Sequence, residues 1–185
     1  MRASPEELES RFLQLEWLMT RCRAAGITRI VLPFVDNSAI RDRVESASVL
    51  EFLRRVLPVA EANRIELHLE TSLAPQPFAD LLAQVSSPFV RVNYDSGNSS
   101  SLGHNPRDEF ISYGNRVGSV HLKDRVRGGG TVPLGTGDAD LPALFASLKA
   151  VHYTGDIVLQ VARGEPGAEI GWARQNREFV SRYWA

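Results

Sequence analysis

The chain has 185 residues, of which 43% are hydrophobic and 23% are charged, and its formal net charge is −1. This length leaves room for one domain with a sizeable core, and the composition is ordinary for a globular protein. A charge so close to zero offers no basic surface for a polyanion, so we expect no nucleic-acid partner.

A single cysteine, Cys22, excludes an internal disulfide, and its position on an apolar helix stripe indicates a core residue. The first ten residues lack the apolar stretch of a signal peptide. No apolar run approaches the roughly 20 residues that a membrane-spanning helix needs. We therefore expect a cytoplasmic protein with no membrane partner.

Helix and strand patterns alternate along the chain. Ser4 and Glu7 form a capping-box pattern that begins the first helix, and Gly26 ends it. Residues 36–46 are polar and are expected to form a loop, and Pro58 is expected to kink the second helix. The expected strands are 27–34, 64–70, 88–95, 117–122 and 155–161, and the expected helices are 4–26, 49–60, 75–85, 105–114, 140–151 and 169–183.

The order of these elements predicts an α/β fold. Five strands that alternate with helices, with no hairpin signal between them, favour a parallel sheet. Strand 64–70 places Glu66, His68 and Glu70 on one face and apolar residues on the other. A doubly wound sheet would be apolar on both faces, so this pattern favours barrel strands whose inner face lines a polar site.

Three of these strands end in residues that commonly bind metals. Glu70, Asp95 and His121 occupy the polar face near the carboxyl ends of successive strands, and Gln160 stands at the equivalent place on the last strand. Active sites of parallel barrels lie at these strand ends. Two carboxylates with an imidazole suit Mn²⁺, Co²⁺ or Zn²⁺ better than Ca²⁺, and Mg²⁺ is a further candidate. We expect such an ion to hold neighbouring sugar oxygens, while a carboxylate moves a proton.

The segment that follows His121 is rich in charge and glycine. Lys123 comes at the strand end, and the glycines of 128–130 follow. With Arg125 nearby, their backbone amides could cradle a phosphate, but a tightly turned surface loop fits the pattern equally well. His68 lies on the same face as the predicted ligands and is interpreted as filling the interior beside the site.

Several of these segments together resemble one known family. They are LETS with Glu70, NYDSGN with Asp95 and Asn98, SVHLKD with His121, PLGTGDAD, and LQVARG. In combination they resemble the xylose-isomerase-like sugar isomerase and epimerase barrels. The resemblance implies an eight-stranded (β/α) barrel longer than this chain. Residues 1–185 would then form a single partial TIM-barrel domain that lacks the first three strands.

The resemblance also implies a metal centre. In the family, Glu, Asp, His and Glu from the last four strands hold a divalent metal, and Glu70, Asp95 and His121 match the first three of these ligands. Gln160 replaces the second glutamate. An amide oxygen can coordinate a cation, but it is neutral and does not take a proton at ordinary pH. Metal affinity would be weaker, and one base of a two-base reaction would be missing.

The same resemblance implies roles in catalysis and substrate binding. Glu70 would act as an acid or base, and Lys123 could substitute for the missing second base. The candidate substrate-binding residues are Asn98, His68, Arg125 and Arg163.

We therefore carry two hypotheses. The first is a metal-dependent sugar or sugar-phosphate isomerase or epimerase. The alternative is a catalytically impaired, incomplete barrel that acts as a binding or assembly module. In either case two unpaired sheet edges favour a homo-oligomer. A base-excision endonuclease of a related barrel type is disfavoured, because the chain has neither a basic bias nor enough His and Glu residues for a three-zinc site.

Overall fold

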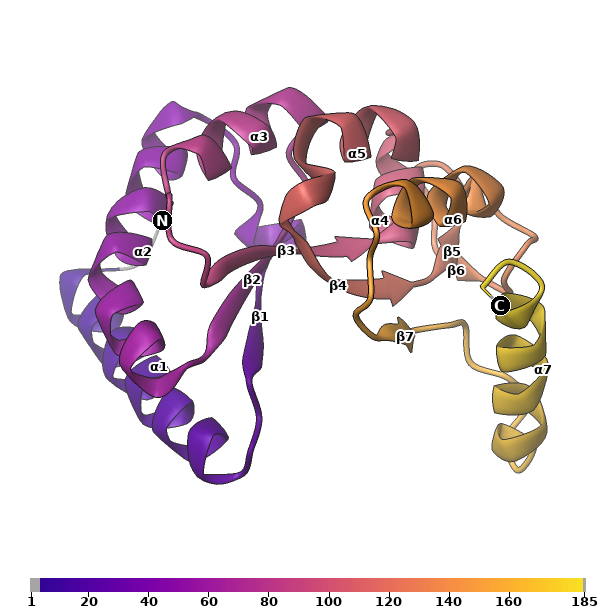
Figure 1. The fold of residues 1–185 in the computed structure, drawn as a ribbon, viewed down its shortest axis with the longest axis horizontal. Coiled ribbons are helices and arrows are strands. Elements are labelled where there is room, and N and C mark those ends of the chain that lie inside the picture. Colours follow the sequence, from indigo (N-terminus) through magenta and orange to yellow (C-terminus); the bar gives the residue numbers. More distant parts are fainter. Residues whose placement is uncertain (1–3, 185) are drawn as a thin grey trace. The chain divides into compact units, whose positions relative to one another are not determined.

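The computed structural model describes residues 4–184, in which strands and helices alternate as expected. Five strands form one sheet with the order β1-β2-β3-β4-β7, and the pairs β1–β2, β2–β3 and β4–β7 are parallel. These strands are β1 Arg29–Phe34, β2 Glu66–Thr71, β3 Val90–Asp95, β4 Val117–Leu122 and β7 Ile157–Leu159 (Figure 1). The α/β fold with a parallel sheet in chain order is therefore confirmed.

The helices join successive strands. They are α1 Pro5–Ala24, α2 Arg43–Asn63, α3 Pro75–Ala83, α4 Ser96–Leu102, α5 Pro106–Tyr113, α6 Leu141–Ala150 and α7 Glu169–Ser181, with 3₁₀ turns η1 Asp36–Ser38 and η2 Gly114–Arg116. Within the described part of the chain, no helix has both the length and the apolarity that crossing a bilayer requires.

The chain divides into two compact units. The N-terminal unit contains the residues up to Leu73 together with Pro77–Val92, and the C-terminal unit contains Ala74–Gln76 together with the residues from Asn93 onward. The division falls inside β3, so the polar half of that strand belongs to the C-terminal unit.

In the N-terminal unit, α1 and α2 lie beside each other. The capping box at Ser4 is confirmed, because its hydroxyl accepts from the Glu7 N–H and the Glu7 carboxylate accepts from the Ser4 N–H. Arg55 on α2 forms an ion pair of 2.6 Å with Glu9 on α1. Cys22 is a free thiol and is buried, as predicted. The core of this unit includes Met19, Leu53, Val56, Ile65, Leu67, Leu69 and Leu81.

One expectation for this unit needs correction. The polar stretch after β1 is only partly a loop, because α2 already begins at Arg43, where Asp42 caps it by accepting from the Glu45 N–H. Pro58 lies inside α2, and the helix continues past it. Val56 and Ala60 on either side of Pro58 are buried in the core, which stabilises the helix there.

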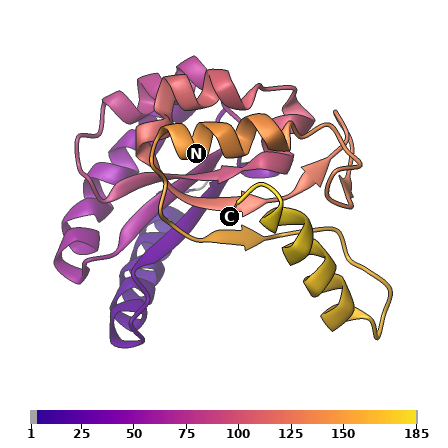
Figure 2. The same ribbon diagram turned by 45° about the vertical axis from the view of Figure 1, so that its right-hand side comes forward.

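In the C-terminal unit, α6 lies over β4 and β7, as Figure 2 shows. Asp140 caps α6 by accepting from the Ala143 N–H, at the start of the helix that the sequence predicted. The Phe145 and Tyr183 rings stack with centroids 5.3 Å apart, which fixes the residues after α7 against α6. The core of this unit includes Val120, Leu122, Leu141, Leu144 and Leu148.

A short helix and a short strand pair of this unit were not expected from the sequence. Helix α4 follows β3 directly, with Asp95 as its N-cap and Gly103 in the left-handed conformation at its end. Strands β5 Asp124–Arg125 and β6 Thr131–Val132 pair antiparallel around the glycine-rich segment. Both elements depend on hydrogen bonds with distant residues, which a local pattern does not reveal.

Candidate metal centre

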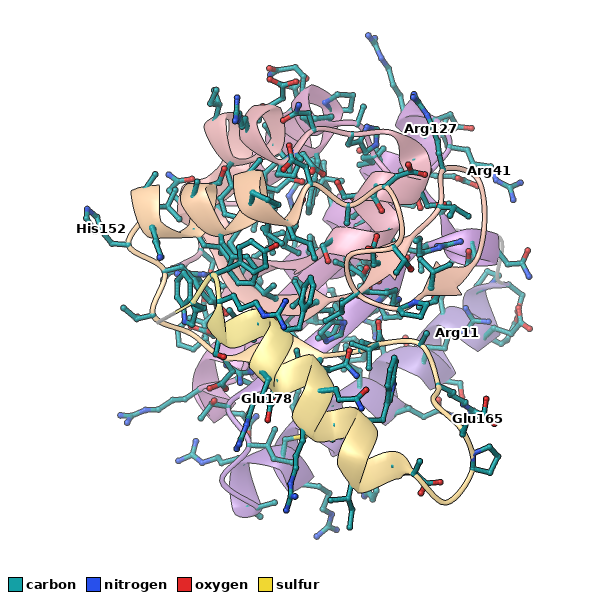
Figure 3. All side chains as sticks on the ribbon, turned by 90° about the vertical axis from the view of Figure 1, so that its right-hand side faces the viewer. Arg11, Arg41, Arg127, His152, Glu165 and Glu178 are labelled. Carbon is teal, nitrogen blue, oxygen red and sulfur yellow. The ribbon has the colours of Figure 1, made fainter. Side chains whose placement is uncertain are left out.

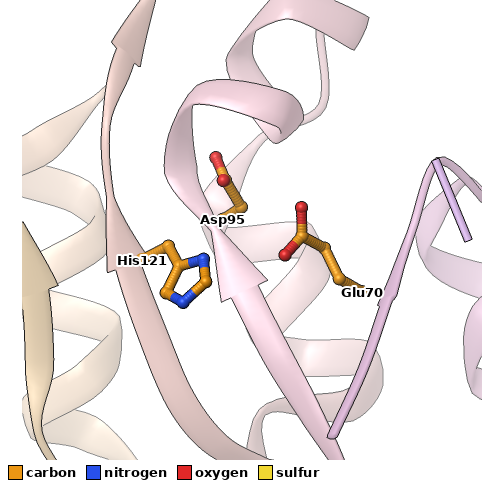
Figure 4. Close-up of side chains that lie close together, drawn as sticks. All are labelled: Glu70, Asp95 and His121. Atoms are coloured by element: carbon orange, nitrogen blue, oxygen red, sulfur yellow. The ribbon is translucent and has the colours of Figure 1, made fainter. Parts of the chain in front are cut away.

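The three predicted metal ligands lie at or near the carboxyl ends of β2, β3 and β4. Glu70 and Asp95 are 8% and 4% exposed, and His121 is half-buried. Figure 4 shows Glu70, Asp95 and His121 close together, and one ligand atom of each lies within 4.8 Å of the others. Asp95 and His121 belong to the C-terminal unit, and Glu70 belongs to the N-terminal unit.

The polar face of β2 differs from the expected one in its burial. His68 is fully buried, and its Nε2 lies 2.9 Å from a Glu66 carboxylate oxygen. Burial lowers the pKa of His68, although the negative charge of Glu66 acts in the opposite direction. The face is therefore packed within the N-terminal unit at His68 and does not open to solvent there.

The imidazole of His121 is oriented by its neighbours in the C-terminal unit. Ser119 donates its hydroxyl hydrogen to Asn93 Oδ1, so the Asn93 amide nitrogen faces His121 Nδ1, at 3.1 Å. Burial lowers the pKa of His121, which favours the neutral imidazole, and the neutral form is the one that binds metals.

The Asp95 carboxylate uses its two oxygens differently. Oδ1 accepts from the Asn98 N–H at 2.8 Å and so caps α4. Oδ2 is buried and has no hydrogen-bond donor among the described residues, but Lys123 Nζ forms an ion pair with it at 2.9 Å. The predicted catalytic residue Lys123 is thus in direct contact with a predicted metal ligand.

Two of the predicted substrate-binding residues contact each other. Arg125 donates from Nη1 to Asn98 Oδ1 at 3.0 Å, and its Nε and Nη2 both donate to the Gly129 carbonyl. The Gly128 N–H donates to the Ser101 carbonyl, and the Gly129 N–H donates to the Val126 carbonyl. The glycine-rich segment is therefore a tight turn whose polar groups are largely satisfied within the protein.

The remaining predicted residues lie after β7. Gln160 is exposed, and its backbone N–H donates to the Leu122 carbonyl, which extends the pairing with β4. Arg163 is exposed in the loop that leads to α7. Their roles as a metal ligand and a substrate contact remain predictions.

One buried polar cluster was not anticipated. Glu109 on α5 is 4% exposed and accepts hydrogen bonds from the hydroxyls of Tyr94, Ser99 and Tyr113. Burial raises the pKa of Glu109, and these three donors oppose that effect. The cluster connects α5 to the end of β3 and the start of α4. The sequence places Glu109 in a predicted helix, but no local pattern indicates that its carboxylate is buried.

Each of the two units contains a cavity. The N-terminal unit has one of about 480 Å³, lined by Leu8, Leu32, Phe34 and other residues of α1, β1 and α2. A smaller cavity of about 200 Å³ in the C-terminal unit borders Ser99 and His104. Neither is lined by Glu70, Asp95 or His121.

Comparison with known proteins defines the class to which this fold belongs. The profile described as xylose isomerase-like TIM barrel matches residues 2–183, so the chain belongs to that family. This agrees with the resemblance in its sequence motifs.

One curated relative is similar in sequence over most of the chain. The chain is 25% identical over 163 residues to an inosose dehydratase of Geobacillus kaustophilus, covering 75% of this chain and 53% of the relative. It therefore spans about half the length of that curated relative.

Solved structures confirm the fold. A structure of the IOLI protein with a binding zinc atom matches with a TM-score of 0.83 at 19% identity, covering 98% of this chain and 73% of that one. A D-allulose 3-epimerase from Methylomonas sp., in complex with D-allulose, matches with a TM-score of 0.77 at 17% identity, covering 98% and 71%.

Proposed function

We propose that the chain contributes to a sugar or sugar-phosphate isomerase or epimerase that uses a divalent metal. The observation that carries this proposal is the grouping of Glu70, Asp95 and His121, with a ligand atom of each within 4.8 Å of the others. Relatives of the same family that are named as an inosose dehydratase and as a D-allulose 3-epimerase support a sugar-like substrate.

The residues present fit a divalent metal. Asp95 Oδ2 is buried without a hydrogen-bond donor, and its one close partner is a cationic ammonium, so the site already accommodates positive charge. His121 is held near its neutral form, and two carboxylates complete a donor set suited to Zn²⁺, Mn²⁺, Co²⁺ or Mg²⁺. The zinc atom in the related IOLI structure is consistent with such a set.

When bound, such an ion would polarise the sugar carbonyl and its neighbouring hydroxyl, which acidifies the adjacent C–H. Glu70, Asp95 and His121 would hold it, with the Gln160 amide oxygen as a weaker fourth ligand. Glu70 would move the proton at the carbon beside the carbonyl. Lys123 is the candidate for the second proton transfer, because Gln160 takes no proton at ordinary pH.

Substrate binding is proposed for four further residues. Arg163 is exposed and could meet a sugar hydroxyl or phosphate, whereas Asn98 and Arg125 are tied to each other and would contact substrate from the glycine-rich side. His68 is fully buried, so its proposed contribution is indirect: it would support the strand that carries Glu70.

A thermal melt tests the metal site. A ligand that binds only the folded state adds about 2.7 kcal/mol at a hundredfold excess over its dissociation constant, which raises the Tm of a chain this size by several degrees. We expect that shift with Mn²⁺, Co²⁺, Zn²⁺ or Mg²⁺ for the wild type. His121→Ala should lose it, whereas His152→Ala, which removes an exposed imidazole pointing outward at the end of α6 (Figure 3), should keep it.

A His121→Ala variant with undiminished metal affinity would rule out the proposed centre. A positive melt would lead to turnover assays with ketoses and ketose phosphates. The substrate assay then separates isomerisation from epimerisation, because only the latter inverts a stereocentre.

A second candidate function is a binding or assembly module without turnover. The neutral Gln160 in place of a second carboxylate favours it. This candidate predicts a homo-oligomer that converts no ketose. A monomer in light scattering that turns over a ketose would exclude it. A cytoplasmic location remains part of either proposal.

A further inference from the structure

The buried charge of Asp95 is balanced in an unusual way. Its side chain is 1% exposed, and Oδ1 is used as the helix cap of α4. Oδ2 receives no hydrogen bond from the described residues, and its charge is met by Lys123 Nζ at 2.9 Å. A single flexible ammonium therefore offsets this buried negative charge.

The position of Lys123 is determined by the start of α4. The Lys123 N–H donates to Ser96 Oγ at 2.9 Å, and the Ser96 hydroxyl donates to the Lys123 carbonyl at 2.6 Å. The aliphatic stem lies against Gly97, where a Cβ atom would come within 2.7 Å of Lys123 Cγ and Cδ. The backbone and stem are thus fixed, and the ammonium points to Asp95.

An ammonium and a divalent cation cannot both lie close to one carboxylate oxygen without strong mutual repulsion. A metal ion held by Asp95 would need Oδ2, the oxygen that the ammonium contacts, because Oδ1 caps α4. We infer that Lys123 is a built-in competitor for the cation position at Asp95, and that a divalent metal binds only when the ammonium leaves Oδ2. This inference rests on the proposed metal centre.

The chemistry of lysine suits this role. Its ammonium is a point charge on a flexible stem, whereas the rigid fork of arginine would form two hydrogen bonds with the carboxylate. The Lys123 side chain is 15% exposed, so its end has a route to water. Of the 21 lysine and arginine residues, only Lys123 and Lys149 are lysines. A lysine beside Asp95 is therefore unusual for a chain whose basic residues are mostly arginine.

Calorimetric titration with Mn²⁺ tests the competition directly. Lys123→Met keeps an unbranched stem against Gly97 and removes the charge. We expect it to raise Mn²⁺ affinity by about 5- to 150-fold, the range of typical coupling between two ligands. Lys149→Met is the matched control, because Lys149 lies on α6 with Nζ 6.0 Å from the Trp184 ring, and it should leave the affinity unchanged.

A second measurement uses the unmodified protein and does not depend on a variant that folds. With only two lysines, acetylation by a reactive ester can be followed at each site by mass spectrometry. Saturating Mn²⁺ should speed acetylation of Lys123, because the ammonium is released from Asp95, and leave the rate at Lys149 unchanged. Acetylation of Lys123 that is unchanged or slowed by Mn²⁺ would overturn the inference.

The outcomes separate the two proposals. Equal or weaker Mn²⁺ binding by Lys123→Met overturns the inference and leaves the metal centre standing. If neither the wild type nor Lys123→Met binds Mn²⁺, the metal centre fails and the inference fails with it. Tighter binding by Lys123→Met that His121→Ala abolishes supports both.

Discussion

Asp95 and Asp124, two buried aspartates of the C-terminal unit, are satisfied by different kinds of partner. Asp124 is fully buried and accepts backbone N–H bonds from Gly135, Gly137 and Ala139 at 2.8, 3.0 and 3.1 Å. Asp95 has one backbone donor, from Asn98, and one ammonium partner. The first arrangement closes a loop, and the second leaves an oxygen whose partner can be exchanged.

The two sets of partners suit a structural role for Asp124 and a functional role for Asp95. Backbone donors are fixed by the fold, so the loop that Asp124 holds persists only while the carboxylate accepts from it. A lysine ammonium can rotate away at the cost of a few torsions, so Asp95 can change partners without unfolding the chain. Of two adjacent residues, Lys123 is therefore an exchangeable partner of Asp95, whereas Asp124 holds a loop in place.

Asp124→Ala should have the largest effect on stability. It removes three charge-assisted hydrogen bonds and releases the segment 135–139, at a cost of roughly 3 kcal/mol in the free energy of unfolding. Urea denaturation measures this loss. Asp108→Ala, at an exposed position on α5, serves as the control and should behave like the wild type. An Asp124→Ala variant as stable as the wild type would contradict the structural role of Asp124.

Glu109→Gln should have an intermediate effect. The amide offers one acceptor where the carboxylate offers two, so at least one of the Tyr94, Ser99 and Tyr113 hydroxyls must find another partner. We expect a loss of about 1–3 kcal/mol, measured by urea denaturation. Glu178→Gln, on the exposed face of α7 seen in Figure 3, should leave the midpoint unchanged. An equal effect of both variants would contradict the role of the buried cluster.

Asp95→Asn should change stability by no more than about 1 kcal/mol, because asparagine also caps helices and the freed ammonium can turn to solvent. The metal-induced rise in Tm should nevertheless disappear. Paired melts with and without Mn²⁺ measure both effects. If Asp95→Asn costs as much stability as Asp124→Ala, the two aspartates do not differ in the way proposed.

The smallest effect is a pH dependence in the N-terminal unit. Because burial lowers the folded pKa of His68 below its ordinary value of 6.5, the neutral form is favoured in the folded state. Its contribution to stability is complete above pH 6.5 and is lost as the pH falls through the lowered value. His68→Gln should flatten the stability profile in that window, as urea melts at several pH values would detect. An unaltered slope would refute this assignment.

Much of the fold follows from local patterns. Alternating and 3.6-residue periodicities located β2, β3, β4 and the long helices, because one-sided burial imposes those periods on any chain. The capping box at Ser4 was predicted, and the helix starts near Asn105 and Asp140 were located, since each of these side chains accepts from a backbone N–H within three residues. The candidate ligands Glu70, Asp95 and His121 followed from strand ends and alternation alone.

The short elements and the partners of buried charges did not follow from local patterns. Helix α4 is serine-rich and depends on Ser96 bonding to the Lys123 backbone 27 residues away. The ion pair of Asp95 with Lys123, the loop held by Asp124 and the bonds of Glu109 to Tyr94 and Ser99 likewise join residues that are 10 to 28 positions apart. Periodicity in a sequence reports which face of an element is buried. Only the packing of strands and helices against one another decides which donor meets which acceptor on that face.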